Sequence, residues 1–260
     1  MPVRAAAIEV RTEGVVGIVS LARSAKRNAI DGAMIRRIGA LFEDPPAEWR
    51  AAVLQAQGEH FSAGLDLAEH RARSPEAVMA VSRLWHRATQ AVRAGRIPVV
   101  AALQGHVIGA GLELAAAAHL RIADPGARFS LPEARRGIFV GGGASVRVGR
   151  LIGASRLTEM MLTGREVEAE EALRIGLVHR LSAPGASLAD ARALAEDVAG
   201  NAPLSNQMII GALEEIADMP QAAGLFTEAL AASYVQTDGE AQARMDAFLT
   251  RKDRKPRDAG

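Results

Sequence analysis

The chain contains no cysteine, which excludes disulfide bonds, thiolate metal sites and a cysteine nucleophile together. It also lacks a charge excess, because 31 basic and 30 acidic residues leave a formal net charge of +1. Proteins that bind nucleic acid usually carry a basic excess or stripe, so we expect no nucleic-acid partner. Any catalytic group must come from residue types other than cysteine.

Long apolar runs are missing as well. No window holds the roughly 20 uninterrupted apolar residues that a membrane-spanning helix needs. The N-terminal segment MPVRAAAIEVRTEG carries acidic residues and reaches no long apolar stretch, unlike a secretory signal peptide. We therefore expect a cytoplasmic protein without a membrane partner.

What is present suits one large α/β unit with an extension. The 260 residues are 49% hydrophobic and 23% charged, which is typical of a folded globular protein. Strand and helix patterns alternate to about residue 185, and helical patterns dominate afterwards. We predict a mixed β/α core over residues 1–185 and a helical region over residues 186–260, whose apolar faces need a surface to pack on.

Turn and cap residues place the first elements. A β-hairpin is predicted over residues 8–21, with Glu13-Gly14 as its turn. Asp31 is a suitable N-cap for the first helix. Apolar spacing then predicts further helices over 75–94 and 112–120.

Two glycine-containing passages carry the first chemical signal. FSAGLDL (61–67) leads from a strand to a loop, and HVIGAGLEL (106–114) leads from a strand into a helix. Glycine lets a substrate approach the main chain closely, and a helix N-terminus favours developing negative charge. One N–H donor from each passage would make an oxyanion hole.

Two glutamates complete the pattern. Glu113 lies in the first turn of the predicted helix, and Glu133 follows the Leu131-Pro132 step twenty positions later, in what we expect to be a rigid turn. A single glutamate in a first helical turn more often stabilises the helix dipole than catalyses a reaction. Two glutamates facing one pocket could divide acid and base roles if their pKa values differ.

FSAGLDL, HVIGAGLEL and LPEARRGIFVGGG resemble the signature segments of the crotonase, or enoyl-CoA hydratase/isomerase, superfamily. RNAI, LTGREVEAEEALRIGLVHRL and DAFLTRK match further family segments in the right order, so the resemblance covers nearly the whole chain. It implies an α/β fold of the crotonase type, a spiral of ββα units in two near-perpendicular sheets. The helical C-terminal region would then build trimers, often paired into hexamers.

The resemblance implies hydration of an enoyl-CoA thioester. It places the oxyanion donors at the amides of Leu65 and Ala110, where the family usually has alanine and glycine respectively. Ala110 is acceptable only if its φ is negative. Glu113 and Glu133 match the two family glutamates; we assign Glu113 as the base that activates water and Glu133 as the acid. Retention of both favours a hydratase over an isomerase or hydrolase of the same superfamily.

The resemblance also implies where CoA binds. We expect contacts from two groups, one around the first oxyanion turn and one in the C-terminal helix: Lys26, Arg27, Ala63, Asp66 and Arg251. The three cations suit phosphate, although solvated surface charge is the alternative. CoA is part of the substrate, so no separate cofactor is expected, and the six histidines lack metal-ligand spacing, so no metal is expected.

Within the superfamily, residues 82–123 and 135–165 are most similar to methylthioacryloyl-CoA hydratases. Trp85 and His86 could line the acyl pocket, although core packing is the commoner role of a tryptophan. The alternatives to a hydratase are a CoA-thioester isomerase or hydrolase and a non-catalytic acyl-CoA-binding protein. An RNA-binding relative is disfavoured by the charge balance.

Overall fold

The computed structural model describes residues 7–70 and 74–253. Within it the chain forms two compact units that divide between Ala199 and Gly200. We expected the helical region to begin at residue 186, but the helix α7 (Ser187–Ala199) packs against strands of the first unit. Its buried alanines, Ala191, Ala195 and Ala199, give it an apolar face that the first unit covers.

The first unit contains a main sheet of six strands in the order β1-β2-β3-β4-β6-β9. Their bounds are β1 Ile8–Glu13, β2 Val16–Leu21, β3 Ala51–Ala56, β4 Val99–Leu103, β6 Leu120–Ala123 and β9 Arg180–Leu181. The strands β1 and β2 pair antiparallel around Gly14, whose φ is 59°, so the predicted hairpin is confirmed. The other neighbours pair in parallel.

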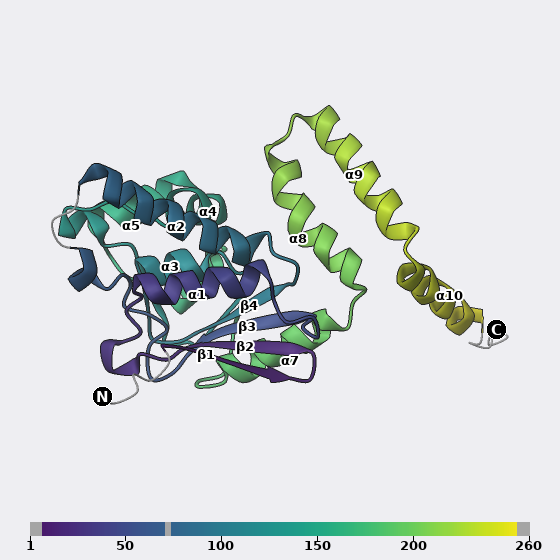
Figure 1. Ribbon diagram of the computed structural model, residues 1–260, viewed down its shortest axis with the longest axis horizontal. Coiled ribbons are helices and arrows are strands. Elements are labelled where there is room, and N and C mark those ends of the chain that lie inside the picture. Colours follow the sequence, from purple (N-terminus) through teal and green to yellow (C-terminus); the bar gives the residue numbers. More distant parts are fainter. Residues whose placement is uncertain (1–6, 71–73, 254–260) are drawn as a thin grey trace. The chain divides into compact units, whose positions relative to one another are not determined.

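Alternation along the central strands explains why both faces of this sheet are covered. Val16 and Ile18 of β2 pack in one apolar cluster with α7, whereas Val19 and Leu21 pack in a second cluster on the other face. That second cluster includes the buried side of α1 (Gly32–Glu43), whose N-cap Asp31 accepts hydrogen bonds from two amides of its first turn. Figure 1 shows the sheet between α7 and α1.

A second sheet of three short strands carries the segments that matter for the site. It has the order β5-β7-β8, with β5 His106–Ile108, β7 Arg128–Ser130 and β8 Val167–Glu168. The remaining helices of this unit are α2 Pro75–Arg93, α3 Ala110–Ala115, α4 Ala144–Ile152, α5 Ala154–Thr163 and α6 Ala169–Arg174. Short 3-10 helices are η1 Ser24–Lys26, η2 Leu67–His70 and η3 Glu133–Arg136.

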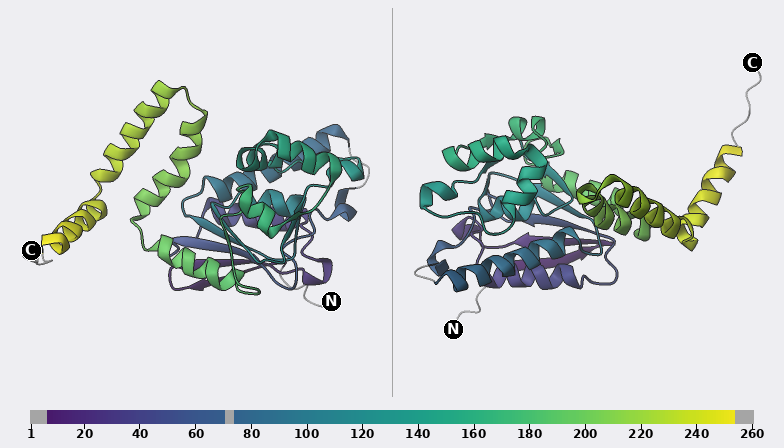
Figure 2. Two further views of the ribbon diagram at one scale, coloured as in Figure 1. Left: turned by 180° about the vertical axis from the view of Figure 1, so that it is seen from behind. Right: turned by 90° about the horizontal axis from the view of Figure 1, so that it is seen from above.

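The second unit is helical. It consists of α8 Pro203–Asp218, α9 Gln221–Gln236 and α10 Gly239–Asp253. α8 and α9 lie side by side (Figure 2), and Gly224 permits their close approach because a Cβ there would lie 3.4 Å from Ile216 Cγ2. Among the residues with a described placement, no helix is long and apolar enough to cross a membrane.

Candidate active site

One cavity brings together the four residues that the two glycine passages and the glutamates predicted. Its volume is about 350 Å³, and its walls come from the turn after Gly64, from α2, from the start of α3 and from the chain between η3 and α4. Leu65, Ala110, Glu113 and Glu133 all line it. These segments are distant in sequence, so tertiary folding creates the site.

The turns around Gly64 and Gly109 meet at the cavity wall. Both glycines have positive φ, 98° and 55°, and a Cβ at Gly64 would lie 2.9 Å from the Ile108 carbonyl oxygen and 3.6 Å from the Ala110 nitrogen. Glycine at position 64 is therefore required by close approach as well as by conformation. The amides of Leu65 and Ala110 follow directly on these two turns.

The neighbouring amides are already engaged. Asp66 N–H donates to the Ile30 carbonyl at 2.9 Å, and Gly109 N–H donates to the Ser130 carbonyl at 2.9 Å. By contrast, no hydrogen bond found within the described residues uses the amide of Leu65 or of Ala110. Both N–H groups are thus available to a carbonyl oxygen in the cavity.

Alanine at position 110 is compatible with this turn. In the described part of the chain, the non-glycine residues with positive φ are Arg27 and Asn28. Ala110 is the first residue of α3, and Gly109 before it supplies the left-handed conformation. The condition that we placed on Ala110, a negative φ, is met.

Glu113 is a buried carboxyl group held by backbone donors. Its Oε1 accepts hydrogen bonds from Gly142 N–H at 2.7 Å and from Ala144 N–H at 3.2 Å. Burial raises the pKa of Glu113, and these two N–H groups, followed by the charges of Arg147 and His86, oppose that rise. The carboxyl group is therefore fixed in orientation, and its ionised form is stabilised against burial.

Glu133 is also buried, but its environment differs. It opens η3 directly after Pro132, and its Oε2 has no hydrogen-bond partner among the described residues. Burial, reinforced by the negative charge of Glu113, raises the pKa of Glu133 to about 7, although a backbone hydrogen bond and Arg136 oppose the rise. A carboxyl group with this pKa is partly protonated at neutral pH and can deliver a proton.

The CoA-binding residues predicted around the first oxyanion turn lie together outside the cavity lining. Asp66 accepts from Arg23 Nη2 at 2.9 Å and from Lys26 Nζ at 3.4 Å, and the bond from Arg23 lowers its pKa. Ala63 N–H donates to the Arg27 carbonyl at 2.8 Å. The geometry gives Asp66 a part in tying this loop to the oxyanion turn, and contact of these residues with CoA stays a prediction.

Arg251 belongs to the second unit. It lies near the end of α10, and its side chain is outside the described residues. Its predicted contact with a CoA phosphate therefore stays a prediction. Among the described residues, no group of three or more histidine or acidic side chains could hold a metal ion.

Sequence analysis missed two features of the cavity. The first is the glycine run 141–143, whose amides hold Glu113; glycines directly before a helix, which leave its first N–H groups unpaired, were the available signal. The second is Trp85, which is 3% exposed and belongs to the core but also lines the cavity. His86 is exposed and faces a separate surface hollow.

Comparison with known proteins defines the class to which this fold and cavity belong. The enoyl-CoA hydratase/isomerase family model matches residues 11–257. The chain is 35% identical over 252 residues to a Thermus thermophilus protein provisionally named an enoyl-CoA hydratase, covering 92% of this chain and 96% of that protein. It is 31% identical over 198 residues to the short-chain-enoyl-CoA hydratase of Clostridium acetobutylicum, covering 74% and 75% respectively.

A solved structure agrees with this assignment. A Rhodopseudomonas palustris protein, provisionally named an enoyl-CoA hydratase, superposes with a TM-score of 0.93 at 44% identity, covering 96% of this chain and 97% of that one. The chain belongs to the enoyl-CoA hydratase/isomerase family. The predicted crotonase-type α/β fold with a helical C-terminal region is thereby confirmed.

Proposed function

We propose that this protein is an enoyl-CoA hydratase, which adds water across the 2,3 double bond of a CoA thioester. The observation that carries this proposal is the pair of buried carboxyl groups, Glu113 and Glu133, which line one cavity together with the unpaired amides of Leu65 and Ala110. An isomerase or hydrolase of the same fold needs fewer acid–base groups, and a binding protein needs none. The reaction needs no resident cofactor, because CoA is part of the substrate.

The mechanism follows from the polarity of these groups. The thioester oxygen binds between the Leu65 and Ala110 N–H groups, which stabilise the enolate-like charge as water attacks Cβ. One such donor is worth roughly 3–4 kcal/mol of transition-state stabilisation in other enzymes. Glu113 accepts the proton that water loses when its oxygen bonds to Cβ. Glu133 gives its proton to Cα, which receives the electron pair of the broken π bond.

The test is hydration of crotonyl-CoA, followed by loss of the enoyl thioester absorbance. Glu113→Gln and Glu133→Gln should each lower kcat by roughly 10²- to 10⁴-fold, the usual contribution of a general acid or base. Glu48→Gln, which changes an exposed carboxylate outside the cavity, should leave kcat unchanged. A wild-type protein that binds CoA esters but hydrates no 2-enoyl-CoA would contradict the proposal, and turnover of a 3-enoyl-CoA would favour an isomerase.

We propose methylthioacryloyl-CoA as the preferred substrate. Support comes from the similarity of residues 82–123 and 135–165 to hydratases of that thioester, and these segments supply Trp85, Glu113 and Gly142 to the cavity. Trp85 lies beside Glu113, since a Cβ at Gly142 would approach both, at 3.1 Å and 2.7 Å. A bulky side chain at this point favours a short acyl group. A kcat/KM higher for crotonyl-CoA than for methylthioacryloyl-CoA would contradict this choice.

We further propose that the protein acts in the cytoplasm as a homotrimer or a hexamer of paired trimers. Large apolar side chains of the second unit are exposed in the single chain, which supports an assembly that covers them: Ile209, Leu213, Leu225, Phe226, Leu230, Tyr234, Met245, Phe248 and Leu249. Their burial between subunits would stabilise the helical region, whose own core is small.

A further inference from the structure

The glycine that holds Glu113 is itself held from the opposite side. The Gly142 N–H donates to Glu113 Oε1 at 2.7 Å, while the Gly142 carbonyl accepts a hydrogen bond from Arg147 Nη1 at 3.0 Å. The hydroxyl of Thr89 lies 3.2 Å from the same carbonyl oxygen and also 2.9 Å from the Trp85 carbonyl. Gly142 therefore links Arg147 to the carboxyl group in the cavity.

The start of α4 explains how Arg147 reaches this carbonyl. Arg147 lies one turn into α4, and side chains of a helix point back toward its N-terminus. Gly143, the N-cap, has a φ of 110°. A Cβ at position 143 would collide with Arg147 Nη1, so the second glycine of the pair leaves room for the guanidinium.

The charge of Arg147 adds to this contact. Glu113 is faced by His86 from α2 and Arg147 from α4, and both charges lower its pKa against the rise that burial causes. Glu133 of η3 is the other carboxyl group of the pair, and Arg136 of the same helix lies near Glu133. Arg147 is the group in this set that combines charge with a hydrogen bond to the chain that holds Glu113.

We propose that Arg147 is a positioning residue for Glu113: through Gly142 it fixes the carboxylate and favours its ionised form. This inference rests on the proposed role of Glu113 as the base. Because the guanidinium is planar and carries several N–H donors, lysine would supply the charge but not the same hydrogen-bond geometry. The consequence is a separation between a charge effect, which lysine restores, and a geometric effect, which it does not.

The kinetic test compares Arg147→Met and Arg147→Lys with the wild type over a range of pH. Arg147→Met should lower kcat at least about tenfold with KM changed less than about threefold, as expected for loss of a group that acts in the transition state. The acidic limb of its kcat profile should move to higher pH. Arg147→Lys should restore the acidic limb more fully than kcat. Arg87→Met is the matched control, because Arg87 is exposed in the same surface hollow, and it should behave as the wild type.

A substrate-free measurement separates this inference from the proposed function. In a Glu133→Gln background, the carboxyl band of Glu113 is titrated by infrared difference spectroscopy and assigned by its loss in Glu113→Gln. Adding Arg147→Met should shift this titration to higher pH. A shift in a protein that hydrates no enoyl-CoA would support the Arg147–Glu113 link while the hydratase proposal fails. An unchanged titration and unchanged acidic limb, or equal changes in Arg87→Met, would overturn the inference, even if Arg147→Met unfolds at lower temperature.

Discussion

At the scale of single residues, the two glutamates of the cavity differ in hydrogen bonding rather than in burial. Glu113 Oε1 accepts two backbone N–H groups, whereas Glu133 Oε2 has no partner among the described residues. Donors to a carboxylate favour its charged form, and burial without them favours the neutral form. The pair therefore separates into a held acceptor and a proton donor, as acid–base catalysis requires.

The raised pKa of Glu133 predicts a pH dependence of stability. Between its ordinary value of 4.5 and about 7 the folded protein binds more protons at this group than the unfolded chain, so the free energy of unfolding falls as pH rises through that window. The loss is at most about 3 kcal/mol, at 1.36 kcal/mol per pH unit. Glu133→Gln removes this dependence.

Urea denaturation of the wild type and Glu133→Gln at pH 5 and pH 8 measures the effect. The variant should gain stability relative to the wild type on going from pH 5 to pH 8. Glu48→Gln, with an exposed carboxylate, is the control and should show no such gain. A difference between Glu133→Gln and the wild type that is the same at both pH values would show that burial does not disfavour the charged form.

At the scale of elements, helix starts supply much of the polar surface of the cavity. The turn from β5 into α3 presents the Ala110 amide, and the glycine run before α4 presents the amides that hold Glu113. Both use N–H groups that a helix leaves unpaired in its first turn. Short helices and glycine turns therefore place donors more closely than side chains could.

Gly142→Ala should inactivate the enzyme without unfolding it. A Cβ at position 142 would lie 2.7 Å from Glu113 Oε2 and 3.1 Å from Trp85 Cε3, so the carboxyl group must move. We expect a loss in kcat of roughly 10²-fold, typical of displacing a general base. Hydration of crotonyl-CoA and circular dichroism measure activity and fold.

Gly211→Ala is the control for this substitution. Gly211 lies inside α8 with nothing within 4 Å of its added Cβ, so alanine should leave kcat unchanged and stabilise the helix by about 0.5–1 kcal/mol. Wild-type activity in Gly142→Ala would mean that the carboxyl group tolerates displacement and that the glycine is not required for catalysis.

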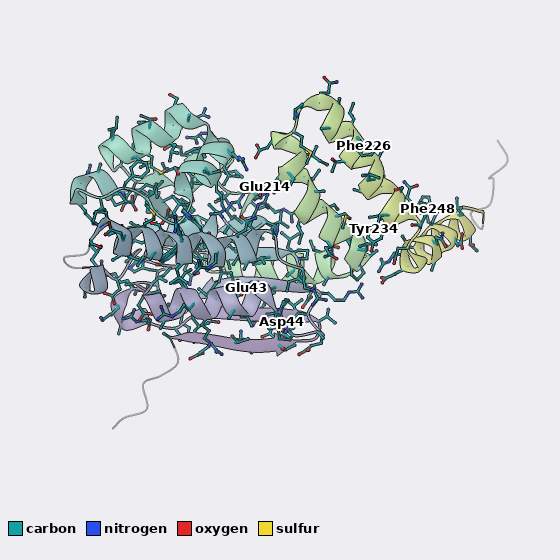
Figure 3. The ribbon with its side chains drawn as sticks, turned by 45° about the horizontal axis from the view of Figure 1, so that its top comes forward. Glu43, Asp44, Glu214, Phe226, Tyr234 and Phe248 are labelled. Atoms are coloured by element: carbon teal, nitrogen blue, oxygen red, sulfur yellow. The ribbon has the colours of Figure 1, made fainter. Side chains whose placement is uncertain are left out.

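At the scale of the whole molecule, the exposed apolar side chains of the second unit predict assembly. Phe226 and Tyr234 on α9 are 66% and 61% exposed, and Phe248 on α10 is 63% exposed (Figure 3). Phe226→Glu should lower the mass measured by sedimentation from that of a trimer or hexamer to that of a monomer. Glu228→Gln, on the same helix, should retain the wild-type mass. A monomeric wild-type protein would contradict the proposed assembly.

The order of elements and the core could be predicted because hydrophobic periodicity and turn residues are local signals. The hairpin around Gly14, the cap Asp31 and the long helix α2 all follow from them. The predicted helix over 112–120 was wrong in extent: α3 ends at Ala115, and His119 N–H bonds to the Val99 carbonyl. Alanine favours a helix locally, but burial of Ala115–Ala118 beside the sheet selects a turn that leads into β6.

The sequence by itself determined the family, the fold class and the four residues that line the cavity, because glycine turns and glutamates at set spacings are visible as residue types. Only the tertiary structure decided that Glu113 is held by Gly142 and Ala144, that Glu133 keeps an unpaired oxygen, and that Asp66 bonds Arg23. Those partners lie about 20 to 45 positions apart in the chain. Hydrogen bonding and burial, and hence the pKa values on which the acid and base roles depend, arise only when folding brings such segments together.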